Sequence, residues 1–166
     1  MKRTDLLEKI FSNVNYWLAF AEAKHAMNIA GVIAILSFVV DLNKCSKLYI
    51  LICVFLLISA LLSFLSFFPT KSKKFKWKMK NNCGSNLLFY EDIKEYTVDD
   101  YLNAINDSIK FDEKETRIDV DYSNEIIVNS KITSRKYKLF KCAIFFDILS
   151  FFLLVMYMID SLFNRF

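Results

Sequence analysis

The chain has 166 residues and a net charge of +4, and 55% of its residues are hydrophobic while 24% are charged. Such a composition indicates a protein that lies partly in a membrane and partly in water. Two Gly and one Pro beside 17 Phe are typical of long helices that meet lipid, and they disfavour a loop-rich catalytic fold.

The first predicted element is an amphipathic helix over residues 4–25. Thr4 is placed to cap it, and Asp5 and Glu8 favour the positive end of its dipole. Its apolar face suits packing on other helices or contact with a membrane surface, and we favour packing. No compact apolar region with a cleavage site occurs here, so we expect no signal peptide. The residues of this face recur at helical spacing: Leu6, Leu7, Ile10, Phe11, Val14, Trp17, Leu18 and Ala21.

Two predicted spans follow, over residues 26–42 and 48–68. The first is short, so part of it is expected at the interface or against a neighbour. The second has 21 residues without a charge, Gly or Pro, which matches the roughly 20 that a helix needs to cross a bilayer. The short connection between the spans predicts an antiparallel hairpin. Ser59, Ser63 and Ser66 suit close helix contact, within one chain or between copies.

Residues 69–138 are predicted to form a small, mostly helical segment, which is short for an independent core. A turn is expected at Asn81–Asn86, and the apolar piece Leu87–Ile93 suits a helical turn or a strand. Thr97–Asp100 resembles a capping box that opens a helix to about Lys110, and residues 111–119 are predicted as a charged loop. The apolar side of the predicted helix carries Tyr101, Leu102, Ile105 and Ile109.

One long helix is predicted over roughly 121–163, and its residues 139–163 form the third span. Asp147 interrupts the apolar run, and an anion that faced lipid there would cost several kcal/mol. We expect Asp147 to be protonated, to face water, or to pair with Lys24 or Lys141. A structural hydrogen bond and a pore-facing or gating role are both open interpretations.

Basic residues set the predicted orientation. Six lysines crowd residues 71–80, and further basic residues precede the first and third spans, whereas the hairpin connection carries only Lys44 and Lys47. The positive-inside rule therefore places the N-terminus and the central segment in the cytoplasm. The cluster at 71–80 also contains Phe75 and Trp77, and we interpret it as an anchor on anionic lipid and not as a nucleic-acid site.

No convergent set of reactive groups is visible. His25 is the only histidine and has no Cys or carboxylate at ligand spacing, so we expect an interfacial side chain. There is no phosphate loop or nucleophile motif. We therefore expect neither an enzyme nor a metal site nor a cofactor. The four cysteines lack metal spacing and are expected to stay reduced: Cys45, Cys53, Cys83 and Cys142.

Several short elements follow one another in a definite order. They are Phe20-Ala21-Glu22-Ala23-Lys24-His25-Ala26, Gly31, Asn86 to Ile93, Tyr101-Leu102, Asn129-Ser130-Lys131-Ile132 and Arg135-Lys136-Tyr137. In this order the chain resembles, over essentially its whole length, the Pycsar effector transmembrane family of antiphage defence proteins. Glu22 departs from the expected pattern, in which Asp takes that position.

The resemblance implies an all-α, multi-pass protein of the bacterial inner membrane that acts in abortive infection. A partner pyrimidine nucleotide cyclase would supply cyclic CMP or cyclic UMP, and the effector would then impair the membrane. We expect the effector to oligomerise in the lipid bilayer. Two alternatives are a membrane-anchored interaction module that recruits a partner, and a small constitutive channel subunit.

A cyclic nucleotide needs cationic donors for its phosphate, and an aromatic face or an amide for its base. The side chains that meet these needs are Arg135, Lys136, Tyr137, Asn86, Tyr90 and Lys94. The simpler interpretation, which we favour, makes Arg135 and Lys136 anchors at the membrane and Tyr137 an interfacial aromatic. Direct binding of the nucleotide to this chain is therefore an open question.

Overall fold

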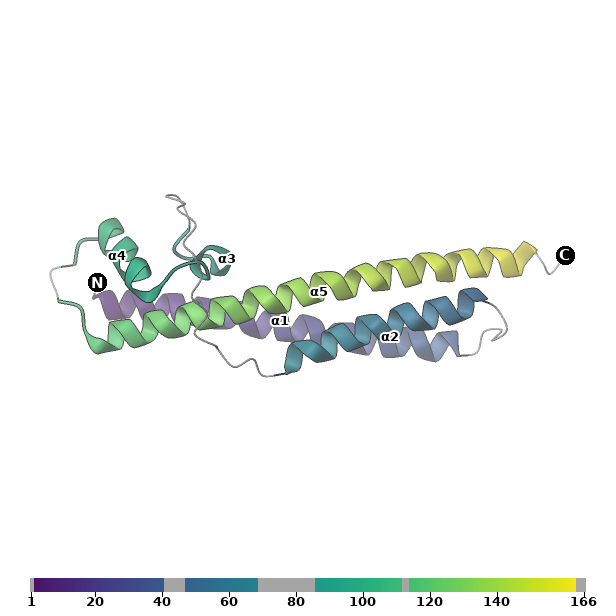
Figure 1. The fold of residues 1–166 in the computed structure, drawn as a ribbon. Coiled ribbons are helices and arrows are strands. Elements are labelled where there is room, and N and C mark those ends of the chain that lie inside the picture. Colours follow the sequence, from purple (N-terminus) through teal and green to yellow (C-terminus); the bar gives the residue numbers. More distant parts are fainter. Residues whose placement is uncertain (1, 41–46, 69–85, 112–113, 164–166) are drawn as a thin grey trace. The chain divides into compact units, whose positions relative to one another are not determined.

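The computed structural model describes residues 2–40, 47–68, 86–111 and 114–163 (Figure 1). Of these described residues 88% are helical and none forms a strand, and three helices are long and apolar enough to cross a membrane. The predicted all-α membrane protein is thereby confirmed. The helices are α1 (Arg3–Val39), α2 (Lys47–Phe67), α3 (Tyr90–Ile93), α4 (Val98–Ser108) and α5 (Arg117–Phe163).

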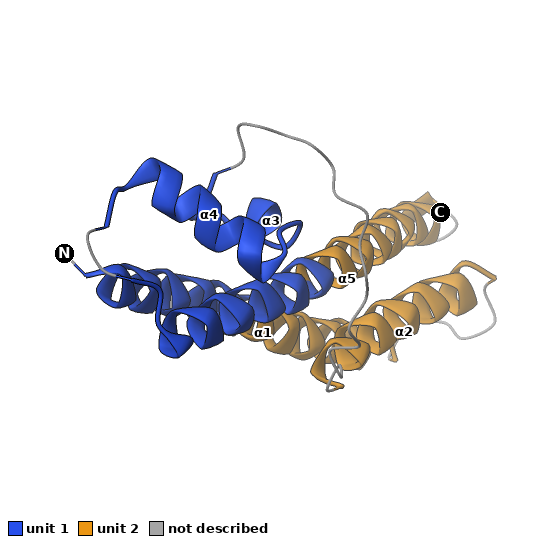
Figure 2. Cartoon of the chain, turned by 60° about the vertical axis from the view of Figure 1, so that its left-hand side comes forward, with its two compact units in different colours: residues 1–21, 69–136 blue, residues 22–68, 137–166 orange. Residues whose placement is uncertain are grey.

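Two compact units make up the chain (Figure 2). Unit 1 comprises residues 1–21 and 69–136, and unit 2 comprises residues 22–68 and 137–166. α3 and α4 belong to unit 1 and α2 belongs to unit 2, whereas α1 and α5 each contribute residues to both. The basic cluster at 71–80, the turn residues 81–85, Cys45 and Cys83 lie outside the described residues, and Cys53 and Cys142 are free thiols.

α1 joins the predicted amphipathic helix and the first span in one continuous helix, because the Ala, Glu and Lys residues around position 23 all favour helix. The prediction that Thr4 caps this helix is wrong. Thr4 lies inside the first turn, and its hydroxyl donates to Asp119 at 2.9 Å. Asp5 caps the start of the helix instead, since its carboxylate accepts a hydrogen bond from the Lys2 backbone N–H at 3.2 Å.

The part of the α1 apolar face from Leu6 to Val14 packs in the core of unit 1, as the packing interpretation predicted. The ring of Phe11 meets that of Tyr122 edge-on, with centroids 5.7 Å apart. Such a core excludes water from one stripe of each helix and is the main source of stability for this small unit. The buried core residues are Leu7, Ile10, Val14, Ile93, Tyr101, Leu102, Ile105, Ile126 and Ile127.

α4 begins with the predicted capping box. The Thr97 hydroxyl oxygen accepts from the Asp100 backbone N–H at 3.2 Å, so the helix starts at Val98. Tyr101 is buried, and its hydroxyl donates to the Leu87 carbonyl at 2.8 Å; burial raises the pKa of this phenol, and the neighbouring Tyr96 adds to the shift. Ile109 does not join the buried face as predicted, because the helix ends at Ser108 and Ile109 adopts an extended conformation.

Of the two elements that flank α4, one matches an alternative that the sequence left open and the other differs from the prediction. The segment Leu87–Ile93, for which a helical turn or a strand was open, ends in the one-turn helix α3. The predicted loop over 111–119 is wrong at its end, since α5 starts at Arg117 and not near 121. The reason is a second capping box, in which the Asp119 backbone N–H donates to the Thr116 hydroxyl at 3.3 Å.

Unit 2 is a bundle of three apolar helical segments. α2 runs antiparallel to the neighbouring part of α1, as the predicted hairpin requires, and the ring of Phe55 lies 5.8 Å from that of Phe146 on α5. In the most apolar stretches of α2 and α5 only 22% of the residues are buried, so the remaining side chains need lipid around them. The buried apolar residues are Val32, Val39, Ile52, Leu56, Leu154 and Tyr157.

Candidate functional site

A polar cluster lies inside the apolar bundle of unit 2 and consists of Asn28, Ser59, Ser63 and Asp147. The Asn28 side-chain amide donates to the Ser59 hydroxyl at 3.0 Å and to the Ser63 hydroxyl at 3.1 Å. Both serines are fully buried. The three spanning segments therefore each contribute a polar group to one place, α1 through Asn28, α2 through the serines and α5 through Asp147.

Asp147 is the member of this cluster with the largest electrostatic cost. Both of its carboxylate oxygens are shielded from solvent. Asn28 and Ser59 are its polar neighbours. In the described part of the chain no ion pair joins Asp147 to Lys24 or Lys141, so the predicted lysine partners are not the ones found.

Asn28 was missed by the sequence interpretation. The serines of α2 were singled out for close helix packing, but their hydroxyls also have a hydrogen-bonding partner on α1. An amide inside a predicted span was the available signal, because a polar side chain in lipid needs a partner on another helix. Its distance of 31 positions from Ser59 left that partner unspecified.

The family-motif residues of α1 lie beside this bundle in different environments. The ammonium of Lys24 sits over the rings of Tyr137 and Phe140, 5.0 and 5.5 Å from their centroids. Glu22 is exposed. Gly31 is also exposed, and a Cβ placed on it would meet no atom within 4 Å. Gly31 is therefore not required for packing within the described residues.

His25 is fully buried, contrary to the interfacial position expected of it. Its ring packs edge-on against Phe140, with centroids 5.5 Å apart, and against Phe67 at 6.4 Å. Aromatic packing of this kind accounts for the burial of the imidazole. Within the described part of the chain, no group of three or more His, Cys, Asp or Glu residues is arranged to hold a metal ion.

Five of the six residues predicted to bind a nucleotide lie in unit 1, and several of them have structural roles there. The Lys94 ammonium pairs with Glu91 and donates to the Ser134 hydroxyl at 3.0 Å, so α3 contacts α5 directly before Arg135. Tyr90 is buried, and its ring lies 6.0 Å from that of Trp17.

The remaining predicted ligand residues differ in environment and in role. Asn86 shapes a turn, since its side-chain oxygen accepts from the Leu88 backbone N–H at 2.9 Å. Arg135 is exposed and Lys136 is buried. Tyr137 belongs to unit 2. The structure therefore brings Lys94 to the segment that carries Arg135, while Asn86 and Tyr90 maintain the fold.

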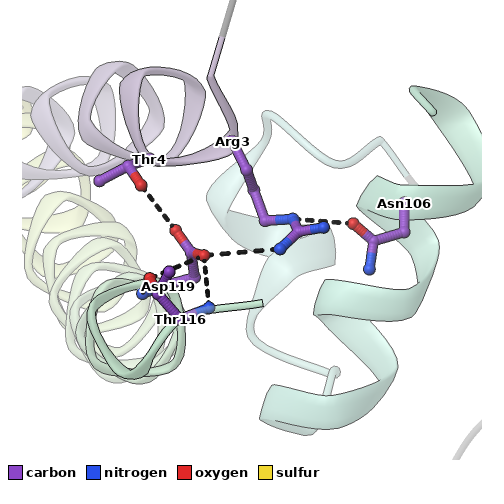
Figure 3. Close-up of polar contacts among 5 residues, drawn as sticks. All are labelled: Arg3, Thr4, Asn106, Thr116 and Asp119. Atoms are coloured by element: carbon purple, nitrogen blue, oxygen red, sulfur yellow. Dashed lines mark hydrogen bonds and ion pairs between the residues drawn. The ribbon is translucent and has the colours of Figure 1, made fainter. Parts of the chain in front are cut away.

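A second polar group, the N-terminal clasp, joins α1, α4 and α5 in unit 1 (Figure 3). Asp119 is 2% exposed and accepts hydrogen bonds from the Thr4 hydroxyl and from the Thr116 hydroxyl and backbone N–H, each at 2.9 Å. Arg3 lies 3.5 Å from the same carboxylate and donates to the Asn106 side-chain oxygen at 3.0 Å. These five residues fix the starts of α1 and α5 to α4.

Asp119 lies outside the spanning segments, and its neighbours stabilise the ionised form of its carboxylate. Burial alone would raise its pKa, but the hydrogen bonds from Thr116 and Thr4 and the positive charge of Arg3 together hold the pKa below its ordinary value. The sequence interpretation missed the clasp. Thr116 and Asp119 have the same spacing as the recognised pair Thr97 and Asp100, and that repeated spacing was the signal for it.

Comparison with known families adds one finding. The family model described as the Pycsar effector protein domain matches residues 6–160. No curated protein and no solved structure matches the chain. The match includes all five helices in whole or in large part, and it agrees with the resemblance carried by the order of motifs.

Proposed function

Because the chain belongs to the Pycsar effector family and has an antiphage effector role, we propose that a cyclic pyrimidine mononucleotide triggers it to impair the inner membrane. The N-terminus and unit 1 then lie in the cytoplasm, where a partner cyclase releases cyclic CMP or cyclic UMP. Several copies of the chain act together in the bilayer. No turnover chemistry is part of this function.

The observation that carries the proposal is the polar cluster inside the spanning bundle. Polar groups at this depth are costly and are typical of ion or water pathways in membrane proteins. In the resting arrangement the Asn28 amide is engaged by Ser59 and Ser63, which closes the cluster with protein hydrogen bonds. A shift of one helix exposes these groups and the Asp147 carboxylate to water, and the hydrated path breaks the membrane barrier there.

Two helices, α1 and α5, couple unit 1 to the spanning segments of unit 2. α1 and α5 each contribute residues to unit 1 and to unit 2, so a rearrangement in unit 1 acts on both spanning segments through continuous backbone. A nucleotide that bound beside Arg135 would compete with Glu91 for Lys94, because its cyclic phosphate carries a negative charge like that of the carboxylate. Release of Lys94 from Glu91 and Ser134 would then loosen the contact between α3 and α5.

Membrane potential in bacterial cells tests the proposal. Cells that express the chain with an active pyrimidine cyclase should depolarise within minutes of cyclase induction, and cells with an inactivated cyclase should not. An interaction module would leave the potential intact in both strains. A constitutive channel subunit would depolarise both. Labelling of the segment around Lys74 from the cytoplasmic side alone is the result expected for the orientation.

A further inference from the structure

An exposed aromatic patch covers part of unit 1. Tyr16 is 64% exposed and Phe20 is 41% exposed, and their rings lie parallel at 6.3 Å between centroids. Trp17 contacts both of these rings and also the buried Tyr90. The patch consists of the exposed Tyr16 and Phe20 and the half-buried Trp17 from α1, and of the exposed Leu88 and Phe89 from the segment before α3.

Two distant parts of the sequence build this patch. The Asn13 side-chain amide donates to the Leu88 carbonyl at 3.2 Å and so holds the segment before α3 against α1. The ring of Phe89 is tilted against that of Tyr90 with centroids 4.8 Å apart, and the ring of Tyr90 in turn contacts that of Trp17. Leu88 and Phe89 are nevertheless 54% and 39% exposed. The described residues of unit 1 therefore order these side chains without covering them.

The surrounding sequence of α1 lacks charge. Residues 10–21 contain no Asp, Glu, Lys or Arg, so the patch lies on a neutral stretch of twelve residues. A water-exposed helix normally carries charged residues on its outer face. An amphipathic aromatic surface without charge matches the boundary between acyl chains and headgroups, where Trp and Tyr are enriched.

The length of the first span places this surface at that boundary. The apolar stretch 26–40 covers only about 22 Å as a helix, whereas the hydrocarbon core is about 30 Å thick and takes about 20 residues. If Val40 lies at the far interface, the near interface falls at about Ala21, directly beside Phe20. Glu22 and Lys24 are then within one turn of the boundary, which their long side chains can reach.

We propose that the aromatic patch docks into the headgroup region of the bilayer that the chain spans, and that its partner is lipid. The docking holds unit 1 against the membrane surface in the absence of any nucleotide. It is independent of the proposed trigger, because none of the five patch residues is a predicted ligand residue. Phe20 and Phe89 insert their rings at the acyl boundary, and the Tyr16 hydroxyl stays in the headgroup layer.

Fluorescence quenching by brominated lipids tests the proposal on the full chain in vesicles of phosphatidylcholine and phosphatidylglycerol. In a Trp77→Phe background, Trp17 should be quenched more strongly by bromines near the headgroup than by bromines at the chain ends. A second probe, Phe89→Trp with both native tryptophans replaced by Phe, should show the same order of quenching. Phe89 is not on a spanning helix, so quenching of this second probe does not simply reflect the position of Trp17 near the first span on α1.

Ile118 supplies the matched control, because it is 57% exposed in unit 1 and lies outside the patch. Ile118→Trp in the same tryptophan-free background should be quenched by acrylamide in water and not by brominated lipid. Acrylamide quenching of the Phe89→Trp probe without lipid quenching would overturn the proposal. Protection of that probe from both quenchers would also overturn it, since a second protein surface would then cover the patch.

Discussion

Replacement of Asp119 by alanine is expected to destabilise unit 1 by about 3 kcal/mol, because it removes a buried carboxylate that pairs with the buried Arg3 guanidinium. The change also removes the acceptor for the Thr4 and Thr116 hydroxyls. In hydrogen exchange on the detergent-solubilised chain, amides of α4 and of the first turns of α1 should exchange about 100-fold faster than in the unsubstituted protein.

Asp121→Ala is the matched control on the same helix. Its ion pair with Arg117 spans 4.0 Å, and both side chains are largely exposed, so the change should stay within about 0.5 kcal/mol. Asp119→Asn keeps the hydrogen-bond acceptor and should restore part of the loss. Equal exchange in the Asp119→Ala and Asp121→Ala proteins would contradict the structural role assigned to the clasp.

The clasp also predicts how stability depends on pH. The folded-state pKa of Asp119 lies below its ordinary value of 3.8, so the stabilisation is fully present above that value. It is lost as the pH falls below about 4 and through the lower folded-state pKa. The Asp119→Asn protein lacks this titration and should show a smaller loss of stability over the same acidic range.

Replacement of Asp147 by asparagine is expected to reduce cyclase-dependent depolarisation by at least about tenfold while the protein remains at equal abundance in the membrane. The substitution keeps the size of the side chain and removes its ability to carry charge. Asp147 is the ionisable member of the polar cluster, so after the substitution a water path through the bundle lacks the one group among these four residues that can attract cations. Membrane potential and immunoblotting of the same cells measure the two quantities.

Asp160→Asn provides the control, because Asp160 lies on the same helix and is exposed near its end. It should depolarise cells like the unsubstituted protein. Asp147→Leu separates structure from function further, since it makes the span more apolar and favours insertion. Unchanged toxicity of the Asp147 variants would remove the carboxylate from the mechanism, and lower abundance of both variants would assign it a structural role.

The helices were predictable where local signals act. A run of apolar residues is enough to predict α2, and the pair Thr97 and Asp100 is enough to predict the start of α4. Both signals depend only on neighbours within a few positions. The same rule applied to Thr116 and Asp119 would have placed the start of α5. The error at Thr4 arose because a hydroxyl near a helix start has two possible partners, the local backbone or a distant carboxylate.

The contacts that build the sites were not predictable in this way. Arg3 and Asp119 are 116 positions apart, and Asn28 is 31 positions from Ser59. Hydropathy periodicity identifies which face of a helix is buried, but it does not identify which polar groups of two buried faces meet. Asp147 was singled out because charge in a span is costly by itself, and its neighbours followed only from the packing of three helices.

Under the proposed function, the chain itself breaches the membrane in response to a cyclic pyrimidine mononucleotide. The decisive test uses purified protein in vesicles that hold a potassium diffusion potential, which a potential-sensitive dye reports. Addition of cyclic CMP or cyclic UMP should collapse the potential, and cyclic AMP should leave it intact. A potential that persists with both pyrimidine nucleotides, in vesicles whose inserted protein is confirmed by protease protection, would contradict the account.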